Sequence, residues 1–322
     1  MPNKFGKYPV SSAVKQYLAA TRKYYAPSTD VERTRKLKYI VKALDNLGIP
    51  HNPANVTSRD VIIFLDWMDA KKVGNAHKRR LMRYLRDYLA YYDNDIVSLM
   101  IAKKQVRVPA EISKDIRSLT LETVQFLHEV TKNMAGWDGT VARFITMAYP
   151  FTGLRPSELR TLRYMDLDQA DWTIRVSHPK GEGVYGQNRR AVILPQAIPA
   201  FKEYLQERTE YLREHGESVN FESLIPYNGR EGLTYWGTSQ LNILKIEIEK
   251  LAGIKFKIKD YRATFCQLAI DKGADLTAVS KMMGHKTTVT TETYYGRIRD
   301  DSAIRELRRA FTEPDVLCLI HS

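Results

Sequence analysis

Apolar side chains keep helical spacing along most of this chain of 322 residues, and they alternate with polar ones in one region only. Between residues 29 and 47 the spacing is that of a helix with one buried face, with apolar residues at Leu37, Ile40, Val41 and Leu44. Alternation is confined to residues 172–176 and, more weakly, to 191–195, on either side of a turn-rich segment. The pattern predicts a mainly α protein, a helical bundle followed by a mostly helical α+β domain with a small antiparallel sheet.

Helix boundaries are marked by capping residues, prolines and glycines. In the first hundred residues we expect four helices, at about residues 10–25, at 29–47, from near Thr57 or Ser58, and after Gly74. Thr29 and Glu32 have the spacing of a capping box, so the second helix is expected to begin there. Further along, Thr120 is expected to cap a helix and Pro150 to end one.

A stretch without clear period separates the bundle from the rest of the chain. Residues 103–118 include Pro109 and are typical of a linker. We therefore expect a helical domain at 1–105, a linker at 106–118 and a second domain at 119–322 that ends in a C-terminal helix and tail. The region from residue 196 to 310 is expected to be helical.

Positive charge is concentrated in the first third of the chain. Residues 1–110 hold 21 lysines and arginines against 9 acidic residues, whereas the remaining residues hold 29 against 28. Such an excess favours a polyanionic partner, and its spread over several helices favours DNA over a membrane surface. A solvated basic surface without a partner is the alternative. Three arginines fall on one face of the fourth helix and are the candidates for DNA contact: Arg79, Arg83 and Arg86.

Several other classes of protein are disfavoured. No apolar run is long enough to span a bilayer, and the first residues lack the apolar stretch of a signal peptide, so we expect a cytoplasmic, nucleoid-associated protein with no membrane partner. The two cysteines, Cys266 and Cys318, have no metal-ligand spacing, so neither a disulfide framework nor a zinc site is expected.

Polar residues spread over the second domain have the chemistry needed to cleave a phosphodiester. Attack on this anion builds further negative charge, which two guanidiniums can stabilise through bidentate hydrogen bonds. A tyrosine hydroxyl is a weak nucleophile near neutral pH and needs a base or a positive field beside it. A lysine can protonate the leaving oxygen, and a histidine can donate a hydrogen bond to the phosphate. The candidate residues are Arg155, Lys180, Lys259, Arg262, His285 and Tyr294.

Taken in order, these residues resemble the motifs of the tyrosine recombinase (phage integrase) family, closest in layout to its Xer-type members. TGLRPSEL matches the family's TG-x-R-x-x-E-L at Arg155 and Glu158. KDYRATF resembles H-x-x-R-H-T-F at Arg262, and MMGHKTTVTTETYY resembles the L-G-H motif and the tyrosine segment after it, at His285 and Tyr294. The resemblance covers nearly the whole chain and is most specific from residue 151 to 296. It also implies a catalytic lysine on a β-hairpin, here Lys180.

The chain departs from the family pattern in the second motif. Lys259 stands where the family usually has histidine, and Ala263 replaces the histidine after the second arginine. A protonated lysine is a poor general base, so we interpret Lys259 as an electrostatic or hydrogen-bonding group. Glu158 is expected to position Arg155 rather than to react.

The hairpin and the tyrosine segment differ as well. The hairpin loop after Lys180 is longer than usual, which leaves Arg189 or Arg190 as alternatives to this lysine. Tyr295 directly follows Tyr294, and because neighbouring residues on a helix point about 100° apart, only one of the two can react. We expect Tyr294 to be the nucleophile and Tyr295 to pack.

The resemblance implies an enzyme that recombines double-stranded DNA sites as a homotetramer, through a Holliday junction, and that is a monomer or weak dimer when free. Its tyrosine forms a 3′-phosphotyrosyl intermediate, so one phosphoester replaces another and neither ATP, metal nor other cofactor is expected. Three alternatives stay open: a type IB topoisomerase, a DNA-binding regulator that has lost catalysis, and a helical protein that binds RNA or another anion.

Overall fold

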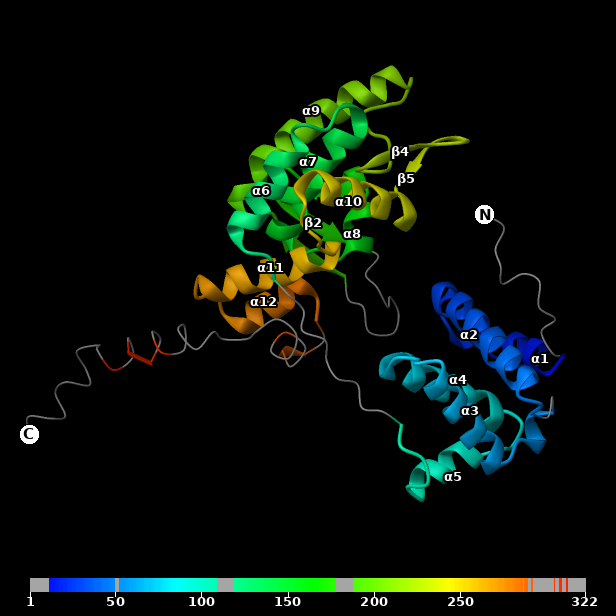
Figure 1. Ribbon diagram of the computed structural model, residues 1–322. Coiled ribbons are helices and arrows are strands. Elements are labelled where there is room, and N and C mark those ends of the chain that lie inside the picture. The colour runs from blue at the N-terminus through cyan, green and yellow to red at the C-terminus, as the bar shows by residue number, and fades with distance from the viewer. Residues whose placement is uncertain are drawn as a thin grey trace, which may run out of the picture. The chain divides into compact units, whose positions relative to one another are not determined.

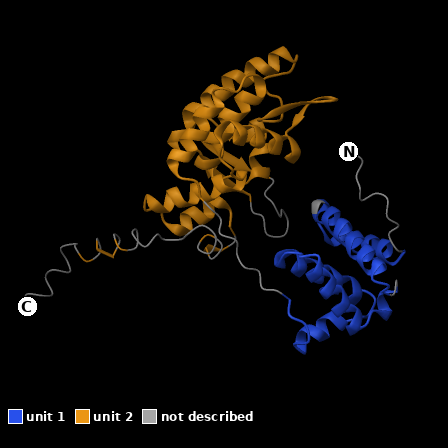
Figure 2. Ribbon diagram, in the orientation of Figure 1, with its two compact units in different colours: residues 1–114 blue, residues 115–322 orange. Residues whose placement is uncertain are grey.

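The chain folds into two compact units, Met1–Lys114 and Asp115–Ser322, shown in different colours in Figure 2. The computed structural model describes residues 12–49, 52–108, 118–177, 188–285, 287–288, 291, 304, 307–308 and 311. Lys180, Tyr294 and Tyr295 lie outside the described residues, as do most of the expected linker and C-terminal tail. Within the described residues, no helix is both long and apolar enough to cross a membrane.

The first unit is a bundle of α-helices (Figure 1). They are α1 (Ser12–Thr21), α2 (Pro27–Asn46), α3 (Ser58–Ala70), α4 (Asn75–Ala90) and α5 (Ile96–Ala102), with short 3-10 turns at Arg22–Tyr24 and Pro53–Asn55. The apolar stripe predicted for α2 is part of its core, because Leu37 and Ile40 are buried. Residues at helical spacing on α4 are buried with it, namely Leu81, Leu85 and Leu89. Burying one such side chain stabilises the fold by about 1.5–3 kcal/mol.

Helix α2 begins earlier than the capping-box pattern predicts. Its first residue is Pro27, and Thr29 and Glu32 lie inside the helix. Proline is well suited to this position, since its fixed φ is already helical and its missing N–H would have no partner in the first turn. The capping box found in this unit is at α3, where Thr57 accepts from the backbone N–H of Asp60 and Asp60 accepts from that of Thr57.

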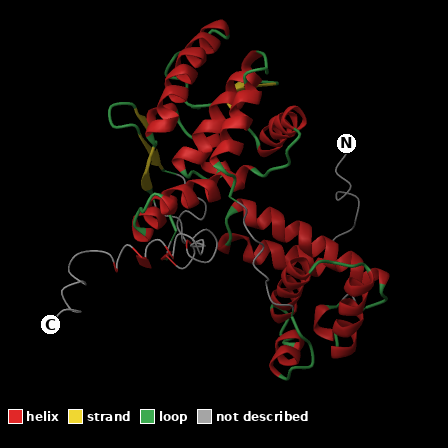
Figure 3. Cartoon of the chain, turned by 60° about the vertical axis from the view of Figure 1, so that its left-hand side comes forward, coloured by secondary structure: helices red, strands yellow, loops and turns green. Residues whose placement is uncertain are grey.

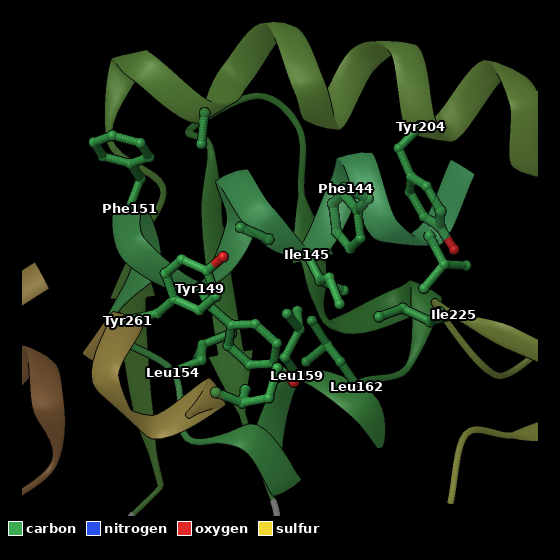
Figure 4. Packing of buried hydrophobic residues seen from close by; sticks show 14 of the residues in the cluster. Phe144, Ile145, Tyr149, Phe151, Leu154, Leu159, Leu162, Tyr204, Ile225 and Tyr261 are labelled. Atoms are coloured by element: carbon green, nitrogen blue, oxygen red, sulfur yellow. The ribbon is translucent and has the colours of Figure 1, made fainter. Parts of the chain in front are cut away.

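The second unit surrounds helix α7 (Gly136–Thr152), which lies between α6 (Leu121–Thr131) and α9 (Ile198–Glu214) in Figure 1. It also packs on α10 (Thr238–Ala252) and α11 (Ile258–Asp271). Nearly the whole length of α7 is buried, and Phe144 stacks on Tyr204 of α9 with 4.0 Å between ring centroids (Figure 4). This packing holds Pro150 inside the helix rather than at its end, although an interior proline costs about 3 kcal/mol.

Strands occur only in the second unit among the described residues (Figure 3). The predicted sheet has the antiparallel order β1-β2-β3, with strands at Leu167–Asp168, Thr173–Val176 and Arg189–Val192. A second hairpin, β4 (Pro226–Gly229) with β5 (Gly232–Tyr235), lies in a region that we expected to be helical. Gly229 and Gly232 are the paired residues on either side of its two-residue turn.

A buried arginine organises the segment that leads into this hairpin. Arg208 of α9 is 1% exposed, and its guanidinium donates to backbone carbonyl oxygens of residues Val219, Phe221, Ser223 and Leu224. The guanidinium also lies 4.5 Å from the ring centroid of Tyr164. Because these contacts satisfy the nitrogens of the guanidinium, the charge can be buried without an acidic partner.

Two short helices complete the second unit and lie next to the polar residues of interest. Helix α8 (Pro156–Arg160) follows α7 after a tight turn, and α12 (Leu276–Met283) packs against α11 and β3. A small cluster fixes α12 on α11, formed by Phe265, Cys266, Val279 and Met283. The turn between α7 and α8 depends on Gly153, which has φ +65° and whose missing Cβ would lie 2.6 Å from the ring of Phe265.

We expect Gly153→Ala to destabilise the protein more than Gly253→Ala does. Both glycines cap helices at nearly the same positive φ, so both substitutions cost about 1–2 kcal/mol in the backbone. Only at Gly153 must a side chain also move, whereas nothing lies within 4 Å of the added atom at Gly253. Overpacking should add about 1–3 kcal/mol, measured as the free energy of urea unfolding. Equal losses in the two variants would contradict this packing argument.

Candidate active site

Segments far apart in the sequence bring five polar side chains together in the second unit. Arg155 and Glu158 lie at the start of α8, Arg189 on β3 and Arg262 in α11, while His285 follows the glycine that caps α12. The sequence predicted four of these residues as site residues and Arg189 only as an alternative to Lys180.

The carboxylate of Glu158 is the anionic centre of this group. Its side chain is 1% exposed, and one oxygen accepts from Nη1 of Arg155 at 2.7 Å while the other accepts from the backbone N–H of Arg155 at 2.8 Å. Both oxygens also accept from Arg189. Burial alone would raise the pKa of this carboxyl, but the hydrogen bonds and charges of Arg189 and Arg155 outweigh it and lower the pKa to about 2. Glu158 is therefore ionised and holds Arg155 in place.

Arg262 is the more deeply buried of the two predicted arginines, with 3% of its surface exposed. Its guanidinium donates to the backbone carbonyl oxygens of Gly153 and Met283, which ties the turn after α7 to the end of α12. It also lies 3.0 Å from Nε2 of His285. The second predicted arginine is thus fixed by the backbone on one side and by the predicted histidine on the other.

The contacts of His285 define which of its nitrogens carries the proton. Arginine can only donate, so Nε2 of His285 must accept from Arg262, and Nδ1 then donates to Oγ1 of Thr291 at 2.7 Å. Burial lowers the pKa of His285, and the charges of Arg262, Arg155 and Arg189 lower it further, to about 3. His285 is therefore neutral near pH 7.

The site as a whole is suited to an anion. Three guanidiniums and one carboxylate give these groups a net charge of +2 when the histidine is neutral. An open cavity of about 520 Å³ reaches His285 and is also lined by Arg189 and Lys281. Among the described residues, no three His, Cys, Asp or Glu side chains are grouped so that they could hold a metal ion.

The remaining candidate residues are placed differently. Lys259 is exposed on the first turn of α11 and has no hydrogen bond or ion pair with the described part of the chain. Arg189 does not replace Lys180 as a free cation, because its guanidinium is bound to the carboxylate of Glu158. Arg190 bonds instead with Asp171 and Thr173, on the exposed side of the sheet. Lys180 and Tyr294 are not among the described residues.

A basic surface lies on α4 of the first unit. Arg79, Arg83 and Arg86 are all exposed, as the sequence pattern predicts. A second basic group was not predicted from the sequence: Nζ of Lys36 on α2 lies 2.9 Å from Nε2 of His77 on α4. Burial, together with the neighbouring positive charges, lowers the pKa of both groups. Positive charge is therefore crowded between α2 and α4.

Comparison with known proteins identifies the chain's relatives. The phage integrase family matches residues 117–300, more than half of the chain and all of the described site. This chain belongs to the phage integrase family. The match includes the positions of Lys180 and Tyr294.

Relatives in this family are tyrosine recombinases. The chain is 27% identical over 272 residues to tyrosine recombinase XerC of Oceanobacillus iheyensis, covering 80% of this chain and 82% of that protein. It is 29% identical over 242 residues to tyrosine recombinase XerA of Pyrococcus furiosus, covering 74% and 76% of the two chains. The family and these relatives make the chain a tyrosine recombinase, an enzyme of site-specific DNA recombination.

Solved structures of two integrases share the fold. The Tn1549 transposon integrase in complex with transposon right end DNA superposes with a TM-score of 0.66 at 18% identity, covering 92% of this chain and 98% of that one. A lambda integrase tetramer bound to a Holliday junction gives a TM-score of 0.63 at 17% identity, covering 92% of this chain and 80% of that one. The prediction of a mainly helical protein with a small antiparallel sheet is therefore confirmed.

We expect protonation of His285 to link stability to pH. Its folded pKa of about 3 lies below the ordinary value of 6.5, so the unfolded chain binds more protons between these values and the free energy of unfolding decreases as pH falls. His285→Gln removes this contribution. Urea unfolding at pH 7 and pH 5 should therefore show a smaller loss of stability in the variant than in the wild type.

The exposed His215 offers a matched control. His215→Gln should keep the wild-type difference between the two pH values. Glu158 contributes little in this window, because its pKa is about 2 when folded and 4.5 when unfolded, and its small contribution is shared by the wild type and the control. If His285→Gln and the wild type lose the same stability between pH 7 and pH 5, the conclusion that His285 is buried in its neutral form is wrong.

Proposed function

We propose that this recombinase cuts and rejoins DNA through a covalent bond between Tyr294 and a 3′-phosphate, with Arg155, Arg262 and His285 binding the scissile phosphate. The observation that carries the proposal is the meeting of these three side chains, from the start of α8, from within α11 and from just after α12, in a site with excess positive charge. Tyr294 follows His285 by nine residues in the sequence, as the family pattern requires.

The proposed reaction exchanges one phosphoester for another. The Tyr294 hydroxyl gives its proton to solvent, and its oxygen forms a bond to phosphorus while the bond to the 5′-oxygen breaks. Lys180 gives a proton to that leaving oxygen and regains one from solvent. Arg155 and Arg262 stabilise the charge on the non-bridging oxygens. The released 5′-hydroxyl then attacks the phosphotyrosine of the partner strand. Lys259 is exposed on α11 and supplies a further positive donor near the DNA.

His285 needs a change of state to act as a donor. Its Nε2 accepts from Arg262 in this structure, so it cannot at the same time donate to a phosphate. A bound phosphate would compete for the N–H groups of Arg262, and its negative charge would raise the pKa of the histidine. Binding of DNA therefore favours a protonated His285, or one with its proton on Nε2.

The partner that we propose is double-stranded DNA carrying two recombination sites. The bound DNA and Holliday junction in the related integrase structures support this partner, and they support a homotetramer as the assembly that acts on it. When free, the protein would be a monomer or weak dimer. We place it in the cytoplasm at the nucleoid, because its substrate lies there.

Tyr294→Phe should bind DNA normally but form no covalent adduct, because the substitution removes only the nucleophilic oxygen. The measurement is trapping of the protein on a nicked duplex in which the cut strand cannot be rejoined, read by a denaturing gel. Tyr295→Phe is the matched control and should keep the adduct. An adduct that survives in Tyr294→Phe and disappears in Tyr295→Phe would overturn the assignment.

Replacing Arg79, Arg83 or Arg86 singly by Gln should weaken DNA binding and make it less sensitive to salt. Each phosphate contact that is lost should reduce the slope of log K against log salt by about 0.9. Arg213→Gln, an exposed change on α9 of the other unit, should keep the wild-type slope. If the slope of log K against log salt is unchanged in all three variants, the proposal that α4 contacts DNA is wrong.

A further inference from the structure

Arg189 of β3 joins three elements of the site through a single guanidinium. Its Nη1 and Nη2 donate to the two oxygens of Glu158, at 3.1 and 2.8 Å. Its Nε donates to the backbone carbonyl oxygen of Met282 at 2.8 Å. The side chain is 7% exposed, and it ties the sheet to the first turn of α8 and to the last turn of α12.

The turn that carries His285 also packs directly on this arginine. Gly284 has φ +65°, and a Cβ on it would lie 2.9 Å from Cδ of Arg189. The carbonyl oxygen of the same glycine accepts from Nη2 of Arg155 at 3.0 Å. Arg189 therefore contacts both the carboxylate that holds Arg155 and the turn from which His285 projects.

Charge gives Arg189 a second effect on Arg155. Glu158 alone would neutralise Arg155, and the pair would attract a phosphate only weakly. With Arg189 bound to both carboxylate oxygens, two guanidiniums share one negative charge, and one positive charge stays available. Removing Arg189 would leave a buried carboxylate that depends on Arg155 for compensation and pulls it away from a phosphate.

We propose that Arg189 is a positioning residue for DNA cleavage, which keeps Arg155 and His285 aimed at the scissile phosphate through Glu158 and the turn at Gly284. This inference rests on the proposed function. Arg189 acts through other residues, because all three of its nitrogens are already bound within the protein. Its guanidinium is held inside the protein by these bonds, so it does not take over the proton transfer assigned to Lys180.

The test compares Arg189→Gln and Arg189→Lys with Arg190→Gln in single-turnover cleavage of a nicked duplex at saturating DNA. Loss of alignment should slow Arg189→Gln by about 100-fold, while DNA affinity changes far less. Arg189→Lys keeps the charge but loses the bidentate contact, so its rate should fall between those of Arg189→Gln and the wild type. Arg190→Gln is the matched control, since its side chain bonds on the exposed side of the same strand, and it should cleave at the wild-type rate.

A double variant separates positioning from simple stabilisation. Glu158→Gln combined with Arg189→Gln removes the uncompensated carboxylate, so it should cleave faster than Arg189→Gln alone. Thermal unfolding of each variant gives the fraction that is folded at the assay temperature. A rate loss that disappears after correction for this fraction would overturn the inference, as would a double variant no faster than Arg189→Gln.

The outcomes also separate this inference from the proposed function. If the wild-type protein forms no covalent adduct, the proposed function fails. If the wild type cleaves and Arg189→Gln cleaves equally fast, only the role of Arg189 fails. Should Arg189→Gln not fold, Arg189→Lys decides, because cleavage at the wild-type rate would overturn the positioning role and a clear loss in the folded protein would support it.

Discussion

The buried carboxylate of Glu158 is the interaction on which the rest of the site depends. An ionised carboxylate with 1% exposure is stable only if donors surround it, and here Arg155 and Arg189 supply four hydrogen bonds. Those donors come from the start of α8 and from β3, so the carboxylate fixes a helix against a strand. The same arginines bind carbonyl oxygens at the end of α12, which brings in the turn before His285.

This arrangement leaves a net positive charge that can bind an anionic substrate. The three guanidiniums exceed the single carboxylate by two charges, and this excess matches the pentacoordinate phosphate of the proposed reaction better than the singly charged phosphodiester. An excess of that size binds the transition state more strongly than the ground state, which is the condition for faster chemistry. The neutral histidine is a consequence of the same crowding.

Much of the fold followed from the spacing of apolar residues, and the errors have physical causes. Local signals were ambiguous at Thr29, where a proline two residues earlier was a better helix start, and at Pro150, where packing around α7 outweighed the helix-breaking tendency. The hairpin at residues 226–235 was missed because its turn glycines lie among helical segments.

Four of the residues that the motifs marked come together in the structure, namely Arg155, Glu158, Arg262 and His285. The motifs could not predict the pairing of Arg189 with Glu158, because that contact depends on how β3 is placed against α8, and the residues are 31 apart in the chain. Contact between Lys36 and His77 depends in the same way on the packing of α2 against α4. Contacts of this kind arise from tertiary structure and leave no periodic pattern.

Several arginines of the second unit donate hydrogen bonds to backbone carbonyl oxygens, and four of them connect the elements described above. Arg155 binds Gly284, Arg189 binds Met282, Arg262 binds Gly153 and Met283, and Arg208 binds four carbonyls before β4. Every amino acid provides a carbonyl, so the acceptor survives when its residue changes, whereas no other side chain offers the same planar set of donors. The residues around these positions can therefore change widely while the same scaffold still forms. After such change, the arginines would be retained among neighbours that differ.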